Sequence, residues 1–189
     1  MENGTKYILG LLIVAAVVVT GVVLILNSGM IIPPDDVLIS QTQTTDNGHG
    51  IGETGQTFTL SEEKSITRIV YSAEYYMTAF TSGNVKCTLY QCDANGLPSE
   101  IIQDSNVIPL SSLASAYTNI TFTFTPVVKA SGVIGGILYL VDPAPSTSQM
   151  AIHVCYPGVY DGGSIISRTP GGPTWMKNSA DAYFIVYGR

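Results

Sequence analysis

Residues Tyr117–Thr125, with the sequence YTNITFTFT, carry the clearest strand pattern in the chain. Ile120, Phe122 and Phe124 alternate with asparagine and threonine residues. Successive side chains of a β-strand point to opposite faces, so the apolar residues would face a core and the polar residues would face water. This stretch therefore predicts a strand in an antiparallel sheet with one buried and one solvated face.

Similar patterns occur on both sides of this stretch. Alternating or short apolar runs are separated by turns rich in glycine and proline, and no helical period is seen among them. The predicted strands are residues 56–60, 65–76, 85–92, 117–125, 137–141, 150–156, 164–168 and 182–187, with short apolar pieces at 101–102 and 107–108. About eight or nine short strands at this spacing predict an all-β fold, an antiparallel β-sandwich over residues 56–189.

A different pattern precedes the strands. Residues 7–26, YILGLLIVAAVVVTGVVLIL, carry no charge, and Thr20 is the one polar residue of the run. A helix crosses a bilayer core of about 30 Å with roughly 20 apolar residues, and it satisfies its own backbone groups in lipid. The segment therefore predicts one transmembrane helix, and the lipid bilayer is its expected partner.

The flanks of this segment predict its orientation. Lys6 and the chain amine precede it, whereas Asp35 and Asp36 follow it with no basic residue nearby. Because basic residues concentrate on the cytoplasmic side, residues 1–6 are expected in the cytoplasm and the large domain outside a cell or virion membrane. The alternative is a cleaved signal peptide, but the run is long and LILNSGM offers no A-x-A cleavage pattern.

Residues 27–55 are expected to form a flexible stalk between the helix and the sandwich. They contain Pro33-Pro34, a Gln/Thr run over residues 41–45 and the polar stretch Asp46-Asn47-Gly48-His49-Gly50. Such composition favours an extended, solvated linker. Within it, only Val37-Leu38-Ile39 suggests a short strand.

Composition and motifs exclude several classes of function. The chain has a net charge of −6, and its basic residues are scattered, which argues against nucleic-acid binding. The two histidines, His49 and His153, accompany no G-x-S-x-G turn, and no C-x-x-C spacing is present. His153 and Cys155 share a strand face, but a polar strand residue is the simpler interpretation of His153. No enzymatic activity is expected.

The turn Asp93-Ala94-Asn95-Gly96-Leu97-Pro98-Ser99 is the most specific part of a resemblance to extracellular jelly-roll domains. The same resemblance includes Phe122-Thr123-Phe124, Tyr160-Asp161-Gly162-Gly163, Trp175 and Asp181-Ala182-Tyr183-Phe184. Such domains occur as accessory or carbohydrate-binding-like modules in surface and phage-related proteins. The resemblance covers about residues 51–189, and it implies a jelly roll of about nine strands without enzymatic activity.

The N-terminal run ending Leu24-Ile25-Leu26-Asn27-Ser28-Gly29 resembles the hydrophobic helix of archaeal pilins and archaellins. Those subunits pack such helices in a filament core and display a β-domain outside. Small residues at 10, 15, 16 and 21 would allow close helix approach. Two functions are therefore expected: a membrane-anchored domain for adhesion or ligand binding, or, as the alternative, a filament, coat or virion subunit that self-associates through residues 7–26.

Three aromatic residues are candidates for ligand binding. Tyr156, Tyr160 and Trp175 lie in or beside loops rich in glycine and proline, and such loops at one end of a sandwich often form a ligand site. Exposed rings stack on sugar faces, so a surface glycan is the expected ligand, with a protein ligand as the other choice. The alternative for Trp175 is a plug at the end of the core.

The cysteine pattern predicts one disulfide and one free thiol. Cys87 shares a strand face with Val85 and Leu89, so it is expected to be a buried free thiol. Cys92 and Cys155 both fall on outward faces by alternation. A Cys92–Cys155 disulfide is expected if their strands are neighbours.

No cofactor is expected, and a structural Ca²⁺ is the one candidate that the sequence leaves open; a glycan on Asn119 is the candidate modification. Jelly-roll binding modules often hold a structural Ca²⁺ through carboxylate and carbonyl oxygens, and the resemblance points to Glu53, Asp93 and Asp181 as its candidate ligands. Asp93 as a turn residue and Asp181 as a strand-entry residue are the simpler interpretations. Asn119-Ile120-Thr121 is a glycosylation sequon, and alternation places Asn119 on the outward face of its strand.

Overall fold

The computed structural model describes residues 34–50, 52–75, 83–142 and 150–189, and all of the strands belong to one compact unit, Asp35–Arg189. The predicted cytoplasmic residues 1–6 and the predicted transmembrane helix, residues 7–26, lie outside the described residues. Within the part that is described, no helix combines the length and apolar character needed to span a membrane.

The unit is built almost entirely of antiparallel strands, which confirms the predicted all-β class. The strands are β1 (Asp36–Gln41), β2 (Asp46–Gly50), β3 (Glu53–Tyr75), β4 (Asn84–Cys92), β5 (Pro98–Asp104), β6 (Ile108–Pro109), β7 (Thr118–Val141), β8 (Met150–Cys155), β9 (Ile165–Arg168), β10 (Met176–Lys177), β11 (Asp181–Ala182) and β12 (Phe184–Gly188). One turn of 3-10 helix, Leu110–Ser112, precedes β7.

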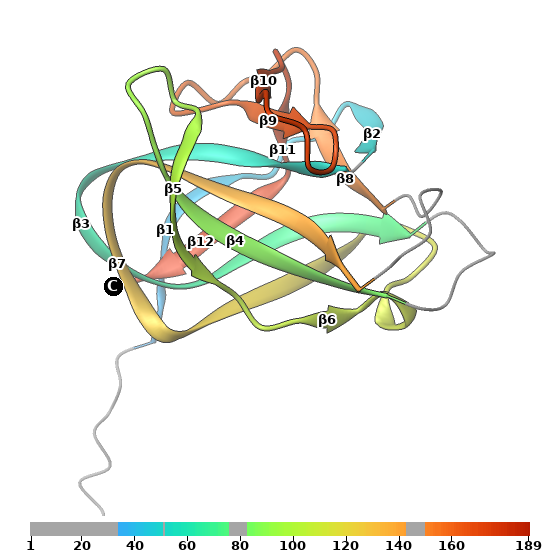
Figure 1. Cartoon of the computed structure of the whole chain (residues 1–189), viewed down its shortest axis with the longest axis horizontal. Helices are drawn as coiled ribbons and strands as arrows, with labels where there is room; N and C mark the ends of the chain where they lie inside the picture. The colour runs from blue at the N-terminus through green and yellow to red at the C-terminus, as the bar shows by residue number, and fades with distance from the viewer. Residues whose placement is uncertain (1–33, 51, 76–82, 143–149) are drawn as a thin grey trace, which may run out of the picture. The chain divides into compact units, whose positions relative to one another are not determined.

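Two long strands organise the sheet. β3 has 23 residues and β7 has 24, and they pair with each other along most of their length. The main path of the sheet runs β1-β12-β3-β7-β4-β5, with β8 and β9 also hydrogen-bonded to β3. Both long strands curve strongly, so each contributes to two parts of the fold (Figure 1).

The pairing of β3 changes along its length. Its first half pairs with the end of β7 and with β9, whereas its second half pairs with the start of β7 and with β12. Contacts then join the two halves: the rings of Phe58 and Phe184 lie 6.0 Å apart, and Tyr71 Oη donates to the Gly136 carbonyl at 2.6 Å. The result is a β-sandwich-like arrangement made by bending one continuous sheet.

The core follows the alternation that defines the strands. Ile120, Phe122 and Phe124 are buried, while Asn119 and the threonines at 121, 123 and 125 are exposed. The facing predicted for this strand is therefore confirmed. Burying an apolar side chain of this size contributes about 1.5–3 kcal/mol. The hydrophobic stabilisation from this strand therefore comes from the side chains on its inner face.

The predicted stalk boundaries are corrected by β1. This strand pairs with β12 from Asp36 opposite Gly188 to Gln41 opposite Phe184, so it is part of the domain. The Asp35 carboxylate fixes its start by accepting hydrogen bonds from Thr67 Oγ1 at 2.7 Å and Arg68 Nη1 at 2.8 Å. The sequence did not predict the whole strand because polar residues surround Val37-Leu38-Ile39. An edge strand is held by backbone hydrogen bonds, which polar side chains do not prevent. The domain begins near Asp35, not at residue 56.

Candidate functional site

One row of side chains crosses four neighbouring strands on the face of the sheet opposite the main core. The register places Lys86 of β4 opposite Tyr139 of β7, Tyr139 opposite Glu53 of β3, and Glu53 opposite Arg168 of β9. Residues opposite each other in a sheet share a face. These four side chains therefore form a continuous line, the cross-strand row, with cationic groups at both ends.

An aromatic cluster, Tyr90, Tyr139 and Trp175, lies against this row. The ring of Tyr90 lies 6.3 Å from that of Tyr139 and 6.3 Å from that of Trp175, and the two tyrosine hydroxyls are 2.5 Å apart. Buried Ile137 and Ile166 pack with the cluster on the same face of the sheet. Trp175 and Tyr139 are only half-buried, so the cluster keeps accessible aromatic surface.

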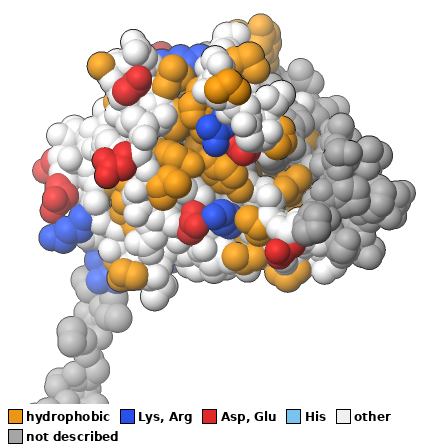
Figure 2. Space-filling model, viewed as in Figure 1, with side chains coloured by type: hydrophobic (Ala, Val, Ile, Leu, Met, Phe, Trp, Pro, Cys, Tyr) orange, Lys and Arg blue, Asp and Glu red, His pale blue; other side chains and the backbone are white. Residues whose placement is uncertain are grey.

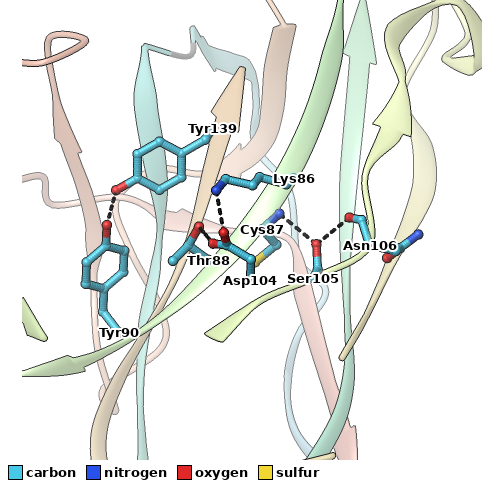
Figure 3. A network of polar contacts seen from close by, with 8 residues as sticks. All are labelled: Lys86, Cys87, Thr88, Tyr90, Asp104, Ser105, Asn106 and Tyr139. Atoms are coloured by element: carbon cyan, nitrogen blue, oxygen red, sulfur yellow. Dashed lines mark hydrogen bonds and ion pairs between the residues drawn. The ribbon is translucent and has the colours of Figure 1, made fainter. Parts of the chain in front are cut away.

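The first end of the row is an ion pair between Lys86 and Asp104. Lys86 Nζ lies 2.5 Å from Asp104 Oδ2, and Thr88 Oγ1 donates to Asp104 Oδ1 at 2.5 Å (Figure 3). Partial burial opposes ionisation of this carboxyl, but the bonds from Lys86 and Thr88 outweigh it and lower the pKa of Asp104. Lys86 also lies 5.9 Å from the centre of the Tyr139 ring, so the pair adjoins the aromatic cluster.

The second end of the row is an ion pair between Arg168 and Glu53. Arg168 Nε donates to Glu53 Oε2, and the Gly171 amide donates to Glu53 Oε1 at 3.2 Å. The Arg168 guanidinium lies 4.2 Å from the centre of the Trp175 ring, which is a cation–π stack. Trp175 therefore connects the loop before β10 to the cross-strand row.

The Tyr139 hydroxyl completes the electrostatics of the site. Burial raises the pKa of Tyr139, and its hydrogen bond with Tyr90 raises it further. The hydroxyl therefore stays protonated at neutral pH and acts as a neutral hydrogen-bonding group. Together the site offers aromatic surface between two charge pairs, which suits a ligand with apolar faces and polar edges.

The apolar character of this face is visible from outside. On the side turned to the viewer in Figure 2, hydrophobic side chains gather in the middle, with basic and acidic side chains beside them. β4 runs across the same side in Figure 1. Ile101 of β5 is opposite Tyr90 and is 61 % exposed, so the apolar surface continues to the edge of the sheet.

The structure separates the three predicted ligand-binding aromatics. Trp175 belongs to the aromatic cluster, but Tyr160 packs edge-on against Phe184 with ring centres 5.5 Å apart. Tyr156 is 55 % exposed, and its amide donates to Thr45 Oγ1 at 2.6 Å. One predicted residue thus lies in the candidate site, next to tyrosines that were not predicted to bind.

The three predicted calcium ligands have separate roles. Glu53 pairs with Arg168, Asp93 Oδ1 accepts the Asn95 and Leu97 amides at 2.9 Å each, and the Asp181 carboxylate accepts bonds from Gln56 and Tyr160. No group of three or more His, Cys, Asp or Glu suited to a metal ion occurs in the described ranges. The structure therefore does not bring these carboxylates together.

The predicted Cys92–Cys155 disulfide is corrected by the structure. Cys87, Cys92 and Cys155 are all free and buried. Cys92 lies on β4 beside Gly135, whereas Cys155 lies on β8 with its Sγ 3.6 Å from the Pro157 carbonyl oxygen. These strands are not partners, because β4 pairs with β5, β6 and β7 and β8 pairs with β2, β3 and β11. The buried free thiol predicted at Cys87 is confirmed.

Free buried thiols predict a specific labelling result. Burial raises the pKa of Cys92 to about 11 and also raises the pKa of Cys87, so little reactive thiolate exists near pH 8. We expect slow iodoacetamide labelling of the native chain and three labels after denaturation without reductant, as counted by mass spectrometry. We also expect dithiothreitol to leave the melting temperature unchanged. A single label in denaturant, or a clear fall in melting temperature on reduction, would indicate a disulfide.

The predicted glycosylation site lies on an accessible strand. Asn119 is exposed on β7, where it pairs with Ser72 of β3, and Thr121 of the sequon is exposed on the same face. Modification of Asn119 stays a prediction.

Comparison with known proteins adds no relative from which a function could be transferred. No protein-family model matches this chain, and no curated protein matches it either.

Proposed function

We propose that this chain is a single-pass, membrane-anchored protein whose extracytoplasmic β-sandwich binds a glycan at a cell or virion surface and thereby acts in adhesion. The aromatic cluster between two ion pairs is the observation that carries the proposal. In this proposal the domain belongs to the jelly-roll binding modules that its sequence resembles, and it has no enzymatic activity.

The chemistry of the site supports a sugar ligand. Sugar rings have apolar faces, which stack on aromatic side chains, and polar edges, which need hydrogen-bond partners. Trp175 and Tyr139 supply half-buried rings, and buried Tyr90 holds both in place. Ion-paired side chains on both sides of the rings supply donors and acceptors. An exposed apolar area with a polar rim is typical of a binding surface.

The anchor in this proposal comes from the sequence. Residues 7–26 form the membrane helix, residues 1–6 stay in the cytoplasm, and the domain follows outside. Because β1 already begins at Asp36, the connection between the helix and the domain is the short segment 27–34. The ligand face is built from β4, β7, β3 and β9, whereas the chain enters the domain at β1, which pairs with β12.

Glycan-array binding of the full chain in detergent micelles tests this proposal. We expect Trp175→Ala to weaken binding at least tenfold, because the variant loses a stacking surface and the stack on Arg168. Tyr156→Ala is the matched control, since Tyr156 is an exposed loop aromatic outside the cluster. Circular dichroism checks that both variants fold.

Two results would contradict the proposed site. Loss of binding in Tyr156→Ala with full binding in Trp175→Ala would move the site to the loop after β8. Absence of binding to any glycan by the unaltered chain would exclude a glycan as the ligand.

A structural subunit is the second candidate function. The apolar run at 7–26, with small residues at 10, 15, 16 and 21, would then pack against copies of itself in a filament, coat or virion membrane. Size-exclusion chromatography with electron microscopy of the detergent-extracted chain distinguishes the two. Ordered polymers that resist detergent would favour the subunit, and a small detergent-soluble particle would favour the anchored binding domain.

A further inference from the structure

We infer that the glycan ligand carries a carboxylate and that Arg168 binds it. This inference rests on the proposed glycan-binding function and names the chemical class of the sugar. The site lies at the end of the cross-strand row, where the Arg168 guanidinium stacks on Trp175. A uronic or sialic acid residue would place its ring against the aromatic cluster and its carboxylate against Arg168.

The position of Arg168 is fixed from two sides. Its Nε is committed to Glu53 Oε2, and its planar group lies 4.2 Å from the centre of the Trp175 ring. Glu53 is itself held by the Gly171 amide, so the partner cannot swing away freely. A guanidinium fixed in this way loses little entropy when it binds a ligand.

The far end of the guanidinium remains available. Toward other described residues, Arg168 donates through Nε, and its two Nη groups make no hydrogen bond. Its side chain as a whole is 23 % exposed, so Arg168 is not sealed from solvent. Two parallel N–H groups on one plane match the two oxygens of a carboxylate, and such bidentate pairs are about twice as strong as neutral hydrogen bonds.

The other cation of the row is less suited to this role. Lys86 is paired with Asp104, which also accepts a bond from Thr88, and its compact ammonium offers no fork. The acidic surface limits the ligand further, because the chain carries a net charge of −6. Densely charged polyanions would be repelled at long range, so we expect isolated acidic sugars within an otherwise neutral glycan.

Matched acidic and neutral sugars test the inference with the full chain in detergent micelles. The probes are sialyllactose with lactose, and a neutral oligosaccharide ending in one glucuronic acid with its carboxyl-reduced form, measured by titration calorimetry. We expect the acidic member of at least one pair to bind about tenfold or more tightly, as loss of a charge-assisted bidentate bond implies. Arg168→Lys should remove this preference, because lysine keeps the charge but not the fork.

Arg68→Lys is the matched control. Arg68 is also stacked on an aromatic ring, at 4.1 Å from the centre of Tyr187, and is also paired with a carboxylate, Asp35, at 2.8 Å. The control should retain the preference for the acidic sugar. Circular dichroism confirms that both variants fold.

The outcomes separate this inference from the proposed function. If neutral and acidic sugars bind equally, or if Arg168→Lys keeps the preference, the carboxylate assignment is wrong while glycan binding stands. If 3′-sulfolactose binds as tightly as sialyllactose, the site is a general anion site and the carboxylate assignment is again wrong. If none of these sugars binds while the glycan array shows binding to neutral glycans, the carboxylate assignment is wrong. If the array shows no binding to any glycan, the proposed function itself fails.

Discussion

Replacing Phe184 by alanine is expected to lower the free energy of unfolding by about 3–5 kcal/mol. The Phe184 ring is fully buried and lies 6.0 Å from Phe58, 6.5 Å from Tyr71 and 5.5 Å from Tyr160. Phe58 and Tyr71 belong to the two halves of β3, so Phe184 fills the space between the two parts of the bent sheet. Guanidinium denaturation measures the loss, with the single tryptophan, Trp175, as the fluorescent probe.

Tyr156→Ala is the control for this truncation. Tyr156 is an aromatic residue of similar size, but its side chain is 55 % exposed, so removing it should change the stability little. Equal losses in the two variants would show that contacts across the bend do not dominate the stability of the domain. Near-ultraviolet circular dichroism of Phe184→Ala would report whether the remaining aromatic core keeps its packing.

The strands were largely predictable because their pattern is local. Alternation over residues 85–92 predicted β4 to within one residue of its start, and the pattern at 117–125 predicted the first part of β7. β3 was predicted as two strands, 56–60 and 65–76, because Ser61-Glu62-Glu63 breaks the alternation. The structure keeps one strand there and absorbs the break as a register shift between Leu60 and Lys64.

β1 was hidden for a different reason. Its partner is β12, at the other end of the chain, and backbone pairing between distant segments leaves no mark on local composition. The stretch after Pro34 therefore looked like a linker, with only Val37-Leu38-Ile39 suggesting a strand. The cluster of Asp35 with Arg68 and Thr67, which fixes the start of β1, likewise joins residues that are far apart in sequence.

The candidate site was predictable only in part. Its loop indicates Trp175 as a candidate, and alternation along residues 85–92 also puts Lys86, Thr88 and Tyr90 on one face of the strand. The cross-strand row also requires the register of β4, β7, β3 and β9, which a single sequence does not contain. Alternation likewise assigned Cys92 and Cys155 to outward faces, but it could not show that other parts of the chain bury both or that their strands are apart.

Replacing Asp181 by alanine is expected to cost about 3 kcal/mol of unfolding free energy, because it leaves buried donors without a partner. The Asp181 carboxylate is 2 % exposed and accepts hydrogen bonds from Gln56 Nε2 at 3.0 Å and the Tyr160 amide at 2.7 Å. Gln56 is fully buried, and its Oε1 accepts the Ala182 amide at 2.9 Å. One carboxylate therefore ties β3 to β11 and to the loop before β9. Guanidinium denaturation measures the cost, and Asp161→Ala at an exposed position is the control.

The same residue distinguishes a structural hydrogen-bond network from the predicted calcium site. If Asp181 acts only through Gln56 and Tyr160, neither calcium nor a chelator should change the melting temperature of the unaltered chain. The Asp181→Ala variant should then be destabilised by the same amount in calcium and in chelator. A calcium ligand gives the opposite pattern, because an ion that binds only the folded state raises its stability. Calcium would then raise the melting temperature of the unaltered chain, and Asp181→Ala would lose that response. We expect the first pattern, since both carboxylate oxygens of Asp181 already accept hydrogen bonds from the protein.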